Sequence, residues 1–333
     1  MTSTTPSLLP INTPMAAPVQ DPARLHALLS AYRTCEFATV TRAGVPATWP
    51  AVCLVAPDAS SIVLTTSIGF ALKAFNVRRN PRVALLFSDP TGAGSGELPQ
   101  VLVQGTAACP DEIRTSPRGM EEYWSQLASR QPSSRMYSAV PLLHPVFDFY
   151  YMRLVITVTP ESVTVRPPLR RGAPTGVERV AKGDSSPFGQ VARRLGGYPD
   201  AVFASVADGG FPELRRVRVA ARTDTRDLDL VDATDPSAPL PSGQANLLFH
   251  AHDPQIDNLR QFGAFGRMAD TDGGPAFSPD RVVTITEAAS PGAMIAAMRQ
   301  AHRSTRGYLK SRGLERPAIP WAEYTAIYAG SKR

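Results

Sequence analysis

The sequence predicts a mainly β protein with flanking helices, built from two small β-barrels in tandem. The length of 333 residues suits two domains of ~150 residues each. Short runs of β-branched and apolar residues, bounded by Gly, Pro, Asp or Ser, recur in both halves and are typical of strands joined by turns. Several such strands at short spacing, with few helices among them, indicate small barrels. Apolar residues make up 43% of the chain and charged residues 19%, an ordinary globular composition.

The first half is expected to start with a helix over residues 21–33, where Asp21 serves as the cap and Pro22 occupies the first helical position. The expected strands cover residues 36–40, 48–55, 61–66, 82–87 and 100–107, and one short helix covers 69–79. Residues 111–139 are expected to be helical. Residues 154–158 and 162–165 are expected to form a hairpin that closes the domain.

Four segments follow from this pattern. Residues 1–20 contain no basic region followed by an apolar one, so we expect a disordered leader and not a signal peptide. Residues 21–166 are the predicted first barrel, and the aperiodic, Arg-, Gly- and Pro-rich residues 167–186 are the predicted linker. Residues 187–333 are the predicted second barrel, with a C-terminal helix over 293–309.

The two halves share an internal repeat. Residues 37–46 align without a gap with residues 203–212, and Phe, Ala, Val, Gly and Pro coincide 166 positions apart. Three further matches follow in the same order: 85–87 with 247–249, the strand of Gly105 with that of Gly266, and 160–165 with 279–284. Chance agreement between generic strand–turn–strand segments is the alternative. Four ordered matches favour a duplication.

Charge and cysteine content exclude several classes of protein. The net charge of +6 is scattered and does not form the single basic stripe of a nucleic-acid interface, apart from one local cluster at Arg215, Arg216, Arg218 and Arg222. The odd set of cysteines favours reduced thiols and a cytoplasmic location: Cys35, Cys53 and Cys109. No apolar run approaches the ~20 residues of a membrane span.

The segment 65–83 contains the residues best suited to bind a ligand. A strand ends in the hydroxyl residues Thr65, Thr66 and Ser67, passes a glycine, and enters a helix with Lys73 in its first turns. Hydroxyls, the backbone N–H groups of a helix N-terminus and one ammonium group suit a phosphate monoester. On residue chemistry alone, the alternative is that the hydroxyls only cap the helix and the lysine is a solvated surface charge.

Several motifs around this segment resemble those of the pyridoxamine 5′-phosphate oxidase-like split-barrel flavoproteins, a superfamily that includes deazaflavin (F420)-dependent reductases. They are Gly44-Val-Pro46, Pro50, Thr65-Thr-Ser67, Lys73-Ala-Phe-Asn76, Asn80-Pro81 and Gln100-Val-Leu-Val-Gln-Gly105. The resemblance covers residues 30–110 well and 200–285 weakly. It implies that both barrels are of the FMN-binding split-barrel type, the second of them degenerate.

The resemblance also implies a cofactor site. Thr66, Ser67 and Lys73 would bind the cofactor phosphate. Thr48, Trp49 and Pro50 would lie near the ring system. Gln100 would be a further contact, and Thr65 and Asn76 belong to the same motifs. Trp49 stands where the true oxidases have an arginine, and their C-terminal substrate signature is absent, so a typical pyridoxamine phosphate oxidase is not expected.

The sequence therefore predicts an oxidoreductase that uses FMN or F420 and acts on a small organic substrate. The cofactor would supply the redox chemistry, and no side chain stands out as a catalytic acid or base. The alternative is a non-catalytic protein that sequesters a flavin or haem. We expect the two barrels to pair within the chain, with the cofactor in the seam between them. A further homodimer is compatible with this arrangement.

The five histidines suggest two other ligands. His250 and His252 invite a metal interpretation, which Asp253 could join. No third ligand of convincing spacing is visible, so no metal site is expected. We expect His250 to lie at a strand end before a helix over 253–262. Haem remains the less favoured cofactor, with these candidate axial ligands: His144, His250, His252 and His302.

Overall fold

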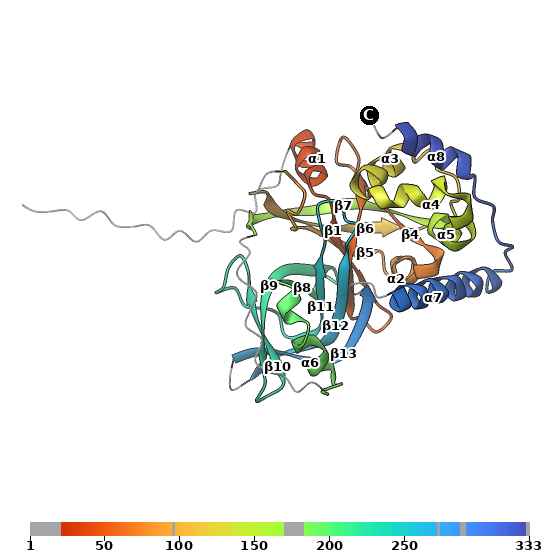
Figure 1. Ribbon diagram of the computed structural model, residues 1–333. Helices are drawn as coiled ribbons and strands as arrows, with labels where there is room; N and C mark the ends of the chain where they lie inside the picture. Colours follow the sequence, from red (N-terminus) through yellow and green to blue (C-terminus); the bar gives the residue numbers. More distant parts are fainter. Residues whose placement is uncertain (1–20, 95–96, 170–182, 272–273, 287–290, 331–333) are drawn as a thin grey trace, which may run out of the picture.

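The computed structural model describes residues 21–94, 97–169, 183–271, 274–286 and 291–330. Two β units lie side by side, with most helices gathered against the first (Figure 1). Mainly β architecture in two barrel-like units is thus confirmed. The predicted leader at 1–20 and most of the predicted linker lie outside the described residues.

The first unit is a seven-stranded antiparallel sheet in the order β2-β1-β5-β6-β7-β4-β3. Its strands are β1 (Cys35–Val40), β2 (Pro46–Ala51), β3 (Cys53–Val55), β4 (Ile62–Ser67), β5 (Arg82–Phe87), β6 (Pro99–Ala108) and β7 (Arg153–Pro168). Its helical segments are α1 (Pro22–Ala31), η1 (Ile68–Phe70), α2 (Leu72–Arg79), α3 (Glu121–Arg130), η2 (Pro132–Arg135), α4 (Met136–Ala139), η3 (Pro141–Leu143) and α5 (His144–Tyr151).

The second unit is a closed six-stranded barrel in the order β10-β13-β12-β11-β8-β9. Its strands are β8 (Ala201–Val206), β9 (Pro212–Arg222), β10 (Asp227–Asp232), β11 (Gly243–Ala251), β12 (Arg260–Thr271) and β13 (Gly274–Thr286). Two short helices precede it, α6 (Pro187–Ala192) and η4 (Leu195–Gly197), and two follow it, α7 (Pro291–Lys310) and α8 (Trp321–Gly330).

Both units connect their strands in the same way. The order of neighbouring strands β1-β5-β6-β7-β4 in the first sheet corresponds to the order β8-β11-β12-β13-β10 in the second. In each unit a glycine marks a break in strand register, Gly105 opposite Pro160 and Gly266 opposite Pro279. A Cβ atom at either glycine would lie 2.1 Å from a backbone oxygen, that of Thr159 or Ser278. The close approach of two backbones therefore requires glycine at both positions.

Two expectations for the first unit were wrong. Residues 154–165 do not form a hairpin: β7 is one continuous strand that pairs with β4 near its start and with β6 along most of its length. The polar stretch 111–139 is not one helix either, since α3 begins only at Glu121 and ends before Pro132. Proline and glycine within that stretch interrupt the helical pattern.

The C-terminal helices, which had been grouped with the second barrel, pack against the first unit. In Figure 1, α7 and α8 run beside the helices of the first unit. Tyr308 and Leu309 of α7, and Tyr324 and Tyr328 of α8, are buried in the hydrophobic core that also contains α1 and β1. The chain thus returns to its first unit after completing the second barrel.

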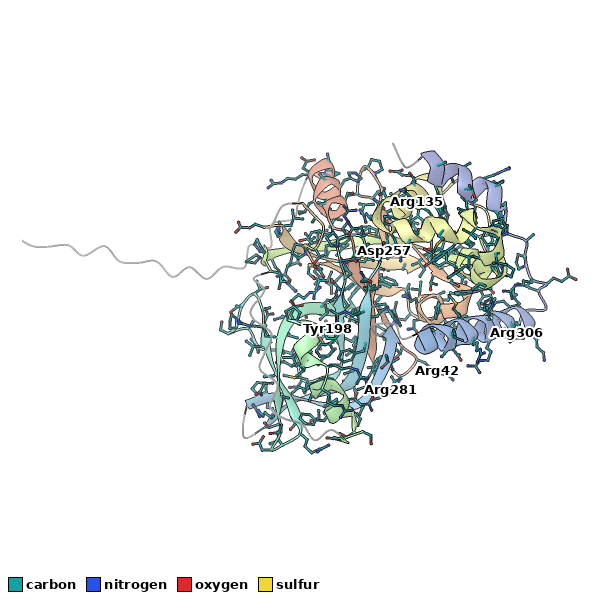
Figure 2. All side chains as sticks on the ribbon, in the orientation of Figure 1. Arg42, Arg135, Tyr198, Asp257, Arg281 and Arg306 are labelled. Atoms are coloured by element: carbon teal, nitrogen blue, oxygen red, sulfur yellow. The ribbon has the colours of Figure 1, made fainter. Side chains whose placement is uncertain are left out.

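An apolar layer joins the two units. It consists of Ala38, Ala84, Leu86 and Leu102 from the first and Val202, Ala204, Leu214 and Leu248 from the second, all buried. Polar contacts extend it at the boundary, where Asp257, labelled in Figure 2, accepts a hydrogen bond at 2.6 Å from the hydroxyl of Ser133. Burial of apolar surface on both sides stabilises this arrangement.

Candidate functional site

A cavity of about 790 Å³ lies where the end of β4, the turn formed by η1 and the start of α2 meet helix α7. Strand β2 adds Trp49 and Pro50 to its wall, and the second barrel adds Gln261 of β12. A cavity of this size is within the range that holds drug-sized ligands and cofactors.

Six of the nine predicted cofactor-binding residues line this cavity: Trp49, Pro50, Thr65, Thr66, Ser67 and Lys73. The other three contribute hydrogen bonds elsewhere. Asn76 donates to the Thr39 hydroxyl at 2.9 Å inside the first unit. The backbone N–H of Thr48 bonds Asn246, and the Gln100 amide bonds Thr234, so both join the two units.

The three hydroxyls of the strand end already have partners in the protein. Thr66 donates to the carbonyl of Phe70 at 2.9 Å, and Ser67 donates to the carbonyl of Phe149 at 2.5 Å. Ser67 also accepts from Gly69 N–H and so caps η1. Thr65 shares a hydrogen bond of 3.0 Å with the Tyr123 hydroxyl. A phosphate would compete with backbone carbonyls for the protons of Thr66 and Ser67, so the hydroxyls alone do not make an anion site.

Two cationic side chains line the cavity without a counter-ion. Lys73 is half-buried, and its Nζ lies 5.0 Å from the centre of the Trp49 ring. Arg153, the first residue of β7, is 9% exposed and stacks over the Tyr150 ring at 4.0 Å. Neither forms an ion pair with any carboxylate of the described residues, and the Arg153 Nε has no hydrogen-bond partner there. Burial, and then repulsion by Arg153, lower the pKa of Lys73 to about 8.

Two further groups of the cavity wall have unused hydrogen-bonding capacity. Among the described residues, no side chain caps the N-terminus of α2, whose N-cap residue Ala71 and first residues Leu72 and Lys73 all line the cavity. Uncapped N–H groups at a helix start attract anions. The Gln261 carboxamide oxygen is buried and has no partner within the described chain. It therefore suits a ligand that offers an N–H donor.

Helix α7 covers one side of the cavity. Its Ala301 carbonyl and Thr305 hydroxyl would each lie 3.1 Å from a Cβ atom at Gly69, so the absence of a side chain there lets the helix rest on η1. Tyr308 of α7 stacks on Phe75 of α2, with ring centres 5.9 Å apart. The sequence did not assign this helix or Arg153 to the site. The feature of the sequence that could have indicated Arg153 is that it is a lone arginine at the start of the apolar strand 153–158.

No histidine, cysteine, aspartate or glutamate is found among the described residues that line the cavity. Of the four histidines considered as haem ligands, His144 stacks on Trp321 with ring centres 3.9 Å apart, and His302 bonds the carbonyl of Val146. His250 and His252 lie in the seam between the two units instead. The cavity therefore offers a haem iron no imidazole from the described chain.

One expectation about the second unit was wrong. Residues 253–262 do not form a helix: a turn follows β11, and β12 begins at Arg260. The side chain of Asp253 bonds the N–H groups of Gln255 and Asp257 in that turn. Arg216, a member of the local basic cluster, is 2% exposed and pairs with Glu36 and Asp200 in the seam.

The fold and the cavity thus define a protein of two small β units, the first of which carries a cation-lined pocket. Residues 22–143 match the family model described as pyridoxamine 5′-phosphate oxidase. The resemblance indicated by the motifs is therefore confirmed for this part of the chain.

Several solved structures are similar to parts of the chain. A conserved hypothetical protein from Mycobacterium tuberculosis is 21% identical over 52% of this chain and 99% of its own, with a TM-score of 0.34. An F420 reductase is 22% identical over 42% of this chain and 94% of its own, with a TM-score of 0.29. A heme storage protein from Vibrio cholerae is 14% identical over 44% of this chain and 95% of its own, with a TM-score of 0.29.

No curated protein is significantly similar to the chain in sequence. Among the helices of the described residues, none has the length and apolar character required to cross a bilayer.

Proposed function

We propose that this protein is an oxidoreductase that binds FMN or F420 in the cavity beneath α7 and acts on a small organic substrate. The observation that carries the proposal is the pair of cations, Lys73 and Arg153, which line the cavity without a carboxylate partner in the described chain. Two unpaired cations in a partly desolvated pocket favour an anionic ligand.

The remaining wall fits the rest of such a cofactor. The uncapped start of α2 adds N–H groups to the phosphate end. The free oxygen of Gln261 suits the imide N–H of a flavin ring, and Trp49 and Pro50 offer an apolar edge for that ring. When bound, the cofactor supplies the hydride chemistry. The chain holds and orients it, and the apolar side chains of the wall exclude water.

The contribution of Gln261 assigns a role to the second unit. We propose that the two units arose by duplication and pair as an internal counterpart of a dimer, since their strands connect in the same order and each has a glycine at the same register break. The second unit would then keep the barrel and supply one wall group, while the first keeps the phosphate site.

A second candidate is a protein that stores or carries the same cofactor without turnover. The specific observation in its favour is that no Asp, Glu, His or Cys of the described residues lines the cavity. If the cavity does support turnover, Lys73, with its pKa of about 8, is the lining side chain best suited to exchange a proton near neutral pH.

The test is reconstitution of the purified full chain with FMN, F420 or haemin, followed by desalting and a visible spectrum. A retained band near ~450 nm or ~420 nm in a 1:1 ratio supports the proposal for FMN or F420. The bound cofactor is then reduced chemically, and its reoxidation by a set of organic acceptors is followed. Retention without acceptor-dependent reoxidation favours the storage function. Retention of haemin alone, or of no chromophore, contradicts the proposal.

A further inference from the structure

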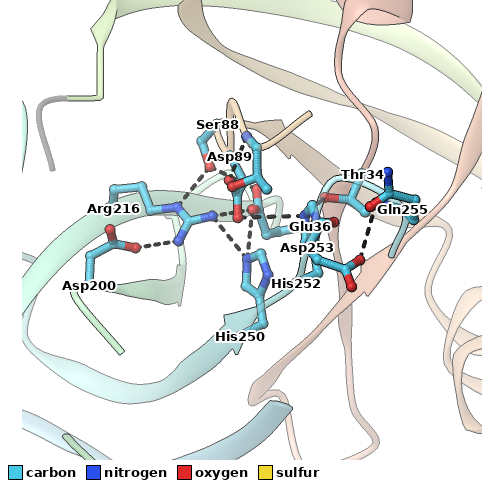
Figure 3. A network of polar contacts seen from close by, with 11 residues as sticks. Thr34, Glu36, Ser88, Asp89, Asp200, Arg216, His250, His252, Asp253 and Gln255 are labelled. Carbon is cyan, nitrogen blue, oxygen red and sulfur yellow. Dashed lines mark hydrogen bonds and ion pairs between the residues drawn. The ribbon is translucent and has the colours of Figure 1, made fainter. Parts of the chain in front are cut away.

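A buried polar cluster lies between the two units (Figure 3), and none of its residues described below lines the cavity. Its centre is Arg216, which pairs with Glu36 at 2.5 Å and with Asp200. Two buried carboxylates thus share one guanidinium group, and the three charges sum to −1.

Two histidines of the second barrel border this cluster, and their hydrogen bonds define which nitrogen of each ring is unprotonated. His252 Nδ1 lies 2.8 Å from the carbonyl oxygen of Asp253, which can only accept, so Nδ1 carries the proton. Its Nε2 is then unprotonated, with a lone pair that can accept a hydrogen bond or bind a metal ion. This nitrogen lies 3.1 Å from the Thr34 hydroxyl and 3.6 Å from Asp89 Oδ2.

His250 is arranged in the complementary way. Its Nε2 lies 2.9 Å from Glu36 Oε1 and 2.9 Å from Arg216. Arg216 has Glu36 as its own acceptor, so Nε2–H donates to the same carboxylate. The other nitrogen, Nδ1, is buried and has no hydrogen-bond partner among the described residues, although His250 is only 3% exposed. An unpaired nitrogen at this depth is costly unless a further group binds it.

We propose that Asp89, His250 and His252 bind one divalent transition-metal ion, with Zn²⁺ as the best match, between the two units. One nitrogen of each histidine and one oxygen of Asp89 lie within 4.8 Å of one another. Ligands at ~2.1 Å around a tetrahedral ion stand ~3.4 Å apart, so the most widely separated pair of these atoms needs to close by at most about 1.4 Å. Two imidazoles and a carboxylate form a donor set typical of Zn²⁺.

The surroundings support a metal site in two ways. Glu36 orients His250, and the Asp253 carbonyl orients His252. Metal-bound imidazoles usually donate the N–H of their other ring nitrogen to a carboxylate or carbonyl group in this way. The nearby cation, Arg216, contacts His250 through Nε2 and is already paired with two carboxylates. The buried charge of the cluster is therefore not positive, and a divalent ion is not repelled.

The ligands come from both halves of the chain. Asp89 follows β5 in the first unit, His250 lies on β11, and His252 directly follows that strand. The sequence interpretation had grouped the histidines with Asp253. The structure replaces this third ligand with Asp89, which is 163 positions away from His252 in the chain. The metal would act as a clamp that fixes the second barrel against the first.

The experiment uses the untagged full chain, dialysed against EDTA and then titrated with Zn²⁺, with Co²⁺ as a spectroscopic probe. We expect one ion per chain by elemental analysis, and a rise in melting temperature on adding Zn²⁺ because the ion binds only the folded state. Asp89→Asn and His252→Gln keep the side-chain volume and are expected to weaken binding by at least 10- to 100-fold. His26→Gln, which removes a histidine of α1 that bonds the Ala56 carbonyl within the first unit, should bind as the wild type does.

Two results would overturn the proposal: no stoichiometric binding by the wild type, or equal binding by Asp89→Asn. If the seam variants do not fold, as judged by circular dichroism, the wild-type Co²⁺ spectrum decides. An intense visible band at one Co²⁺ per chain, displaced by Zn²⁺, supports the proposed tetrahedral site. The absence of this band, or a band that persists in excess Zn²⁺, rules it out.

Discussion

Replacement of Lys73 by alanine is the perturbation that most directly probes the phosphate end of the cavity. The ammonium group has no carboxylate partner in the described chain, so its removal leaves no buried charge unpaired and should preserve the fold. One charge-assisted hydrogen bond to phosphate contributes ~1.5–3 kcal/mol, which is about a 10- to 150-fold loss of affinity. The partial burial of Lys73 favours the upper part of this range.

The pKa of Lys73 gives this prediction a pH dependence. The pKa is lowered to about 8, so the ammonium form dominates below that pH and the neutral amine above it. An anionic ligand binds the ammonium form, and the phosphate itself is doubly ionised above pH ~6. Affinity should therefore be flat between pH ~6.5 and ~7.5 and then fall, by up to tenfold per pH unit, as the pH rises through 8. Lys73→Arg should abolish this fall because a guanidinium group stays charged.

The assay is fluorescence titration of FMN, or of F420, at a series of pH values. Lys310→Ala is the matched control, since Lys310 is exposed at the end of α7 and does not line the cavity. Unchanged affinity in Lys73→Ala, with a wild-type melting curve, would refute the assignment of Lys73 to the anion site. A pH profile shared by the wild type and Lys73→Arg would refute the role of its ionisation.

Three further predictions concern the framework. Arg216→Met leaves two buried carboxylates without their guanidinium group and should lower the free energy of unfolding by ~3–5 kcal/mol in urea titrations; a loss below ~1 kcal/mol would mean that the cluster contributes little. Gly105→Ala and Gly266→Ala should each lower the melting temperature far more than Gly209→Ala, because the first two place a Cβ atom 2.1 Å from a backbone oxygen whereas at Gly209 the nearest atom lies 3.9 Å away, and similar effects at all three positions would contradict the register-break interpretation. Ending the chain at residue 286 removes α7 and α8 and should abolish cofactor binding and expose the first core; retained affinity would exclude α7 from the site.

Local patterns predicted much of the first unit. The helix at Asp21 is capped as expected, by the Asp21 side chain accepting from Ala23 N–H, and the strands around 36–40, 82–87 and 100–107 lie close to their predicted bounds. These elements have strong alternation or clear caps, and their identity depends on few distant contacts. Most of the site residues predicted from the motifs, including those at 65–73, line one cavity.

What the sequence did not predict depends on tertiary contacts. Arg153 gives no periodic signal, and only its position beside the end of β4 places it in the cavity. Arg216 lies in a basic run that resembles a solvated face, but the first unit covers it and supplies Glu36. The apolar stripe of α7 predicts a buried face without identifying the surface that buries it, so the helix was grouped with the wrong unit.

The central claim is that the cavity binds a cofactor through its phosphate. The most direct measurement compares the dissociation constants of FMN and riboflavin, which share the ring and differ in the phosphate, for the purified full chain at pH 7. The account predicts that FMN binds at least ~10-fold more tightly and that the difference shrinks to near unity when Lys73 and Arg153 are both replaced by methionine. Equal affinity of the wild type for FMN and riboflavin, or a preference for FMN that survives the double replacement, would contradict it.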